Sequence, residues 1–107
     1  MPNLTKNPTL KNFQKYVAEL ENERGFSHQT IIDKCLLLGE EVGELFKAVR
    51  KSEGLAVDIN SNFTEIGDEL TDIFIYLCAI ANRKGIDLEL AFREKELKNK
   101  QRVWKSV

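Results

Sequence analysis

Residues 31–51, IIDKCLLLGEEVGELFKAVRK, decide the fold class, because their apolar positions recur with the period of an α-helix. We predict a helix over about residues 29–51. At about 100° per residue one apolar stripe forms its expected core face: Ile31, Cys35, Leu38, Val42, Leu45 and Val49. A second line sets two acids between two apolar residues: Leu37, Glu41, Glu44 and Ala48. A fully solvated face rarely has this composition, so these acids are expected in partly buried surroundings.

The rest of the chain is also helical in pattern. No stretch alternates like a half-buried strand, and both prolines lie within the first eight residues. Gly25 and Gly85 indicate the ends of two helices, and Asp87 can cap another. We therefore predict an all-α protein with further helices over residues 9–23, from about 62 or 64 to 85, and from 87 to about 104, and with one long loop over 52–62.

Length and charge limit the class of protein. The 107 residues fit one domain, 1–107, with a small core, so a partner subunit is expected. Sixteen basic against seventeen acidic residues give no argument for a nucleic-acid polymer or a membrane surface as partner. The start of the chain lacks the pattern of a signal peptide, and Cys35 and Cys78 lack the spacing of a zinc site. We expect a cytoplasmic protein with both cysteines reduced in its core.

A second pair of acids lies on the predicted third helix. Glu69 and Asp72 are three residues apart and so lie close together on the helix surface. From Ser52 to Asn82 there are six acids and no Lys or Arg, a local charge of -6. Clustering carboxylates without cations raises their pKa values and costs free energy unless a counterion is bound. Oxygen-only ligands select Mg²⁺, Mn²⁺ or Ca²⁺, and a phosphate substrate would favour Mg²⁺.

A simpler interpretation exists for the second helix alone. Its acids can be solvated and paired with basic residues three or four positions away: Glu40, Glu41 and Glu44 with Lys47, Arg50 and Lys51. The third helix has no such cations, which favours the metal site. A di-iron site would need Glu-x-x-His, and the only histidine is His28.

These acids carry a family resemblance. Glu40-Glu41-Val42-Gly43-Glu44 followed by Glu69-Leu70-Thr71-Asp72 resembles the EExxE and ExxD signature of MazG nucleotide pyrophosphohydrolases. Residues 85–89 resemble the family's link into its last helix, and Lys95, Asn99 and Arg102 fit its KxxxNxxR pattern. The resemblance extends over about residues 10–104. It implies a four-helix bundle that dimerises tightly, often as a dimer of dimers, and splits a nucleoside triphosphate into monophosphate and pyrophosphate.

The resemblance also implies a cofactor and its ligands. The ion would be Mg²⁺, with Mn²⁺ as a possible substitute, held by Glu41, Glu44, Glu69 and Asp72. For the catalytic residues we predict Glu40 and Glu41, with Glu40 orienting water from outside the metal ligands and the general base left open. No Ser, Cys or His constellation suggests a covalent intermediate, so direct attack by water is expected.

The fourth helix carries the opposite charge. Four residues share one face that can bind phosphate oxygens, and we predict that they contact the substrate: Lys95, Lys98, Asn99 and Arg102. The alternative is that basic residues merely complement the C-terminal end of the helix dipole, which we prefer for Lys100 and Lys105.

Recognition of the base is predicted near the start of the second helix, by Phe26, His28 and Gln29. Their structural alternatives are a packing anchor for Phe26 and helix caps for His28 and Gln29. The favoured substrates are deoxynucleoside triphosphates, in nucleotide-pool housekeeping. Two other functions remain open: a phosphoribosyl-ATP pyrophosphohydrolase, and a non-catalytic helical module that binds a partner through its acids.

Overall fold

The computed structural model describes residues 1–105, and within them it contains four helices and no strand. The helices are α1 (Leu10–Arg24), α2 (Ile31–Ser52), α3 (Ile66–Arg83) and α4 (Leu88–Lys100). The predicted all-α class is therefore confirmed. No helix among these residues is both long enough and apolar enough to cross a lipid bilayer.

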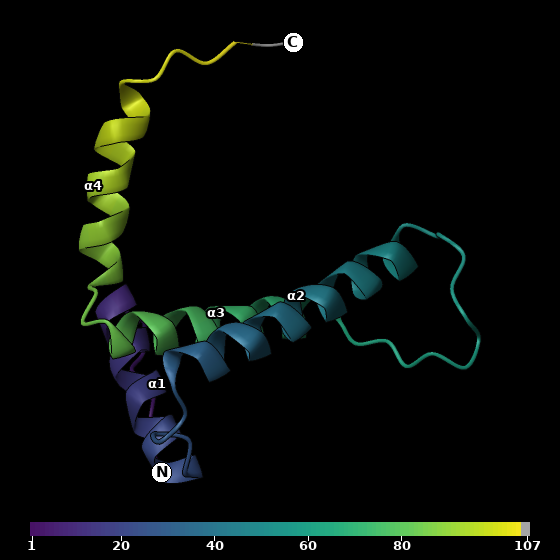
Figure 1. Cartoon of the computed structure of the whole chain (residues 1–107), viewed down its shortest axis with the longest axis horizontal. Coiled ribbons are helices and arrows are strands. Elements are labelled where there is room, and N and C mark those ends of the chain that lie inside the picture. The colour runs from purple at the N-terminus through teal and green to yellow at the C-terminus, as the bar shows by residue number, and fades with distance from the viewer. Residues whose placement is uncertain (106–107) are drawn as a thin grey trace.

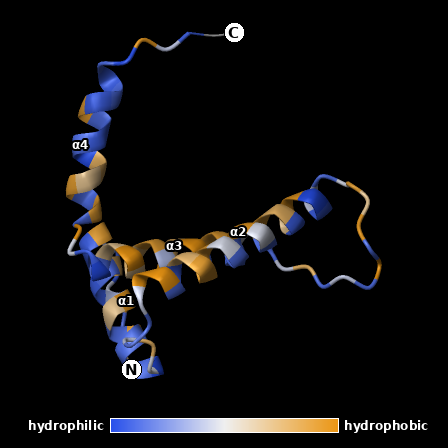
Figure 2. Cartoon of the chain, viewed as in Figure 1, coloured by the Kyte–Doolittle hydropathy of each residue, from blue (hydrophilic) through white to orange (hydrophobic). Residues whose placement is uncertain are grey.

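The helices have an open arrangement (Figure 1). α2 and α3 form a long antiparallel hairpin, α1 crosses one end of it, and α4 points away from the hairpin. Most of the apolar residues lie on the hairpin, whereas α4 is largely hydrophilic (Figure 2). The two helices with the predicted acids are thus the two that pack together most extensively.

Side-chain caps fix where three helices begin. Thr9 with Asn12 and Thr30 with Asp33 form reciprocal capping boxes at α1 and α2. Asp87 caps α4 as predicted, since its Oδ1 accepts a hydrogen bond of 3.1 Å from the Leu90 N–H. Because Thr30 occupies the cap position of α2, the alternative role of His28 and Gln29 as caps is wrong.

Two predicted boundaries are also wrong. α3 begins at Ile66 rather than near 62 or 64, because the Thr64 hydroxyl bonds to the Glu69 carboxylate instead of capping the helix. The loop therefore extends over 53–65. α4 ends at Lys100 rather than near Trp104, because the chain turns there through bonds from the Gln101 and Arg102 N–H groups to carbonyls three residues earlier.

The core lies where α1 crosses the hairpin. It consists of Val17, Leu20, Cys78 and Ala79, with the Phe13 and Phe74 rings packed edge to face at 5.1 Å. The buried Gln14 side chain crosses from α1 to the turn after α3, where it donates to Ile86 O at 2.8 Å and accepts from Leu88 N–H at 2.9 Å. These bonds fix the point at which α4 leaves the rest of the chain.

The predicted core face of α2 is only partly correct. Cys35 is exposed and Val49 is 40% exposed, although Cys78 is buried as expected. The side of α2 that faces α3 is centred instead on a line that includes the buried residues Lys34 and Ala48. The apolar residues of α2 extend over more than one stripe, and polar residues occupy part of the side that faces α3. Large apolar side chains consequently remain exposed on α2, namely Ile32, Leu36 and Phe46.

Candidate active site

Three of the four predicted metal ligands meet between the two hairpin helices. Carboxylate oxygens of Glu41 on α2 and of Glu69 and Asp72 on α3 all lie within 4.8 Å of one another. Glu69 is buried and 4% exposed, Glu41 is half-buried and Asp72 is exposed. Helical spacing explains the meeting, because Glu69 and Asp72 are neighbours on α3 and Glu41 lies on the α2 side that faces them.

The pKa values of this acidic cluster reflect carboxyl groups that lie close to one another. The pKa of Glu41 is raised to about 7, first because its carboxyl shares a proton with that of Glu69, then through burial and the neighbouring charges. Burial, followed by the charges of Glu69 and Asp68, raises the pKa of Asp72. The pKa of Glu69 is lowered, contrary to the general expectation for clustered acids, because Glu69 accepts hydrogen bonds from Glu41 and Thr64.

One oxygen of the cluster has no partner. Glu69 Oε1 accepts from the Thr64 hydroxyl at 2.5 Å, but apart from the proton of the Glu41–Glu69 pair the buried Oε2 lacks a hydrogen-bond partner among the described residues. Buried polar atoms are almost always paired, and an unpaired carboxylate oxygen beside two further acids fits the donor set of a hard divalent cation. The residues present therefore fit a metal ion.

A cavity of about 240 Å³ adjoins the cluster and shares Asp72 with it. Phe26 and Gln29, both predicted to contact the base, line this cavity, and Tyr76 lies on its wall as well. Gln29 Oε1 is buried and has no hydrogen-bond partner among the described residues. His28 is exposed and does not line the cavity.

A buried ionic group, not anticipated from the sequence, adjoins this cavity, and two of its members, Glu21 and Lys34, line it. Glu21 Oε2 lies 3.0 Å from Lys34 Nζ, and Arg83 donates to both Glu21 oxygens at 2.9 and 2.8 Å. Arg83 also donates to the Gln29 and Phe26 carbonyl oxygens, which fixes the loop between α1 and α2. Burial alone would raise the pKa of Glu21, but the hydrogen bonds and charges of its two cations lower it overall.

The sequence contains a signal for this group. Counting back from Glu41 by one and two turns along the inward side of α2 leads to Leu37 and Lys34. Glu21 likewise follows Gln14 and Val17 at helical spacing on α1. A charged residue on the inward side of each helix indicates that it is buried, but not which distant residue it pairs with.

Comparisons with known proteins agree with this geometry. The model of the MazG nucleotide pyrophosphohydrolase domain matches residues 26–105, about three quarters of the chain. The chain belongs to the MazG family. Two crystal structures of iMazG from Vibrio DAT 722 resemble it: the Ctag form has 29% identity over 86% of this chain and 98% of that chain, with a TM-score of 0.67. The Ntag form has 28% identity over 91% and 99%, with a TM-score of 0.68. No curated protein matches the chain.

Because the chain belongs to the MazG family, it is a nucleotide pyrophosphohydrolase. It is therefore an enzyme rather than a non-catalytic module. The MazG family is metal-dependent in general, and the acidic cluster is a group of carboxylates that could hold a metal ion.

Two predicted acids of this MazG domain lie outside the cluster. Glu44 forms an ion pair with Lys47 at 3.6 Å near the surface, as the simpler interpretation of α2 expects. Its charge nevertheless contributes to the raised pKa of Glu41. Glu40 is exposed.

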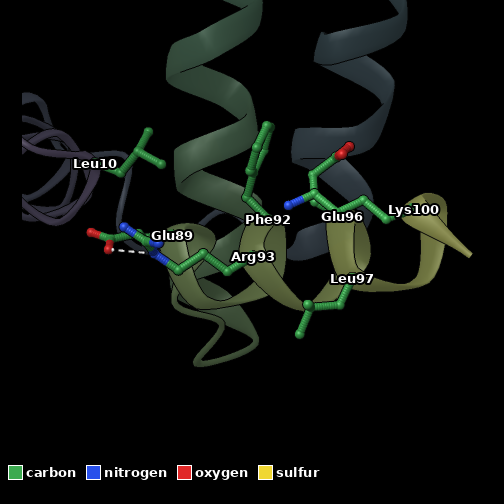
Figure 3. Close-up of a pocket in the computed structure, with 7 residues that line it drawn as sticks. All are labelled: Leu10, Glu89, Phe92, Arg93, Glu96, Leu97 and Lys100. Atoms are coloured by element: carbon green, nitrogen blue, oxygen red, sulfur yellow. Dashed lines mark hydrogen bonds and ion pairs between the residues drawn. The ribbon is translucent and has the colours of Figure 1, made fainter.

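Three of the four residues predicted to bind phosphate lie on α4, away from the acids, whereas Arg102 lies in the turn after the helix rather than on the predicted helix face. Lys95, Lys98 and Arg102 are exposed, and Asn99 donates to Glu96 Oε1 at 3.1 Å. α4 contacts α1 and points away from the hairpin (Figure 1). A hollow of about 750 Å³ lies along a different side of α4 and includes Phe92 and Leu97 (Figure 3). None of the predicted site residues lines it.

Proposed function

We propose that this MazG enzyme hydrolyses nucleoside triphosphates, deoxynucleotides preferentially, to the monophosphate and pyrophosphate with Mg²⁺, or Mn²⁺ in its place. The observation that carries the proposal is the group of Glu41, Glu69 and Asp72, whose oxygens converge while one buried oxygen lacks a partner among the described residues. Hydrolysis of such substrates would serve nucleotide-pool housekeeping.

The proposed ligands are Glu41, Glu69 and Asp72, with Glu44 joining them through a change of rotamer that releases Lys47. A bound Mg²⁺ neutralises charge on phosphate oxygens and lowers the pKa of water. The pKa of Glu41 is raised to about 7 beside its acidic neighbours, so its charged form is unfavourable there and a bound cation would stabilise it. Glu40 is exposed beside Glu41 and is the carboxylate proposed to orient the attacking water.

We also propose that the working enzyme is a homodimer or a dimer of dimers. Ile32, Leu36 and Phe46 are 62–69% exposed on α2, and Phe92 and Leu97 are 66% and 63% exposed on α4. Exposed apolar side chains in such number are typical of a subunit interface. A second copy also offers a route by which Lys95, Lys98, Asn99 and Arg102 reach the phosphates bound at an acidic cluster on another chain.

The whole of residues 1–107 would then act as one domain. A cytoplasmic location is proposed because Cys35 and Cys78 are both free thiols, which suits a reducing compartment.

Product analysis with a panel of triphosphates tests the function. The purified chain with Mg²⁺ is expected to convert at least one deoxynucleoside triphosphate to monophosphate plus pyrophosphate. Stepwise release of inorganic phosphate would contradict the reaction. Cleavage of phosphoribosyl-ATP, with every nucleoside triphosphate left intact, would favour the related phosphoribosyl-ATP pyrophosphohydrolases instead.

A further inference from the structure

Lys34 is a buried cation at the wall of the cavity beside the acidic cluster. Its side chain is 3% exposed, and its ammonium lies 5.2 and 5.4 Å from the ring centroids of Phe26 and Tyr76. Both rings and Lys34 line the same cavity as Asp72. A charge at this depth is costly unless acceptors satisfy it.

The ionic group around Lys34 carries surplus positive charge. Arg83 already donates to both oxygens of Glu21, so one carboxylate serves two cations. An ammonium has three donors. Among the described residues, Glu21 is the only oxygen acceptor that Lys34 has, and no ion pair joins Lys34 to Asp72. Lys34 therefore has hydrogen-bond donors to spare.

The shape of the cavity indicates which part of a substrate would use these donors. Whole ligands occupy about 300–1,000 Å³, so a cavity of 240 Å³ suits one part of a nucleotide. Two aromatic rings and the aliphatic side chains of Leu37 and Ile75 suit a planar base rather than a phosphate. The phosphates belong at the Asp72 end, where the cation is proposed.

We infer that Lys34 is a specificity-determining residue that donates a hydrogen bond to a ring carbonyl oxygen of the nucleobase. This rests on the proposed function. Cytosine, thymine, uracil and guanine have such an oxygen, whereas adenine does not. The enzyme therefore favours carbonyl-bearing bases over adenine, and this preference depends on the ammonium.

The test compares kcat/KM for dCTP, dTTP, dGTP and dATP in the wild type and in Lys34→Met. Methionine keeps the length of the side chain, and Glu21 retains Arg83 as partner. Losing a charged hydrogen bond is expected to lower kcat/KM by about tenfold to a hundredfold for the three carbonyl-bearing substrates and to leave dATP nearly unchanged. The matched control is Lys51→Met, an exposed lysine at the end of α2, which should behave as the wild type.

Each other outcome has a definite meaning. An equal loss with all four substrates would place the ammonium on a phosphate or the sugar and overturn the inference, as would no loss with any. If Lys34→Met does not fold, Lys34→Arg keeps the charge but displaces the donors, and the same base-dependent loss is expected. A wild-type chain that hydrolyses none of the four substrates would instead refute the proposed function, and the inference would fall with it.

Discussion

Two glutamates of this chain are buried to the same degree but are neutralised in different ways. Glu21 and Glu69 are 5% and 4% exposed. Glu21 lies between Lys34 and Arg83 and is fully paired by cations of the chain itself. Glu69 lies against Glu41 and Asp72, and one of its oxygens has no partner among the described residues. The first group is neutralised within the chain, whereas under the proposed function the second would be neutralised by a cation from solution.

The largest effect is expected from removing the charge of the paired glutamate. Glu21→Gln leaves Lys34 and Arg83 buried without their carboxylate and should lower the free energy of unfolding by about 3 to 5 kcal/mol. Urea denaturation monitored by circular dichroism measures this loss. Glu19→Gln, at an exposed position of α1, is the control and should change the stability by less than about 0.5 kcal/mol. Equal stability of the two variants would contradict the role of Glu21.

The unpaired cluster should respond in activity rather than in folding. Asp72→Asn is expected to lower kcat by about a hundredfold or more, because removing one electrostatic contact at a reacting group typically costs that much. Its circular dichroism spectrum should match the wild type. Asp68→Asn removes the same charge one turn earlier on α3, outside the cluster, and should retain most of the activity. Near-normal turnover of Asp72→Asn would reject the proposed ligands.

Mg²⁺ should stabilise the chain through the acidic cluster alone. A cation that binds only the folded state adds about 2.7 kcal/mol at a hundred times its Kd. In thermal melts, Mg²⁺ should raise the Tm of the wild type and of Asp68→Asn and leave the Tm of Asp72→Asn almost unchanged. The same increase in all three proteins would indicate binding elsewhere.

The smallest effect concerns the pH dependence of stability, which has opposite signs for Glu41 and Glu21. The folded-state pKa of Glu41 is raised from 4.5 to about 7, so its contribution is present below pH 4.5 and is lost as pH rises towards and through 7. The lowered pKa of Glu21 gives stability above pH 4.5 that is lost as pH falls through the folded-state value.

Urea denaturation from pH 4 to 8 without divalent ions separates these contributions. Glu41→Gln removes the repulsion and should be more stable than the wild type at pH 8, by on the order of 1 kcal/mol, with no such gain at pH 4. A pH-independent difference between the two proteins would contradict the raised pKa of Glu41.

The sequence predicted the acids of the cluster better than the basic group beside it. Glu41, Glu69 and Asp72 follow from helical spacing and from the absence of Lys and Arg over residues 52–82. Lys34 was missed because its partners, Glu21 and Arg83, lie on two other helices, and only the crossing of α1 over the hairpin brings them together. Local periodicity gives the face of a residue but not which distant helix meets that face.

Helix ends show the same limit on a smaller scale. Thr9, Gly25 and Asp87 act locally, and the ends that they define lie within two residues of the prediction. Thr64 has a side chain that can cap a helix, yet its hydroxyl bonds to a ligand of the proposed cation. Competition between a local cap and a tertiary partner cannot be resolved from the order of residues alone.

Arg83 has a thermodynamic consequence for whatever occupies the cavity. Its guanidinium makes five hydrogen bonds, to the Glu21 carboxylate and to the carbonyl oxygens of Phe26, Gln29 and Ala79. The wall that carries Phe26 and Gln29 is thus immobilised in advance, at the expense of the folding free energy. The protein therefore loses less conformational entropy there when a ligand binds, so more of the contact energy appears as affinity.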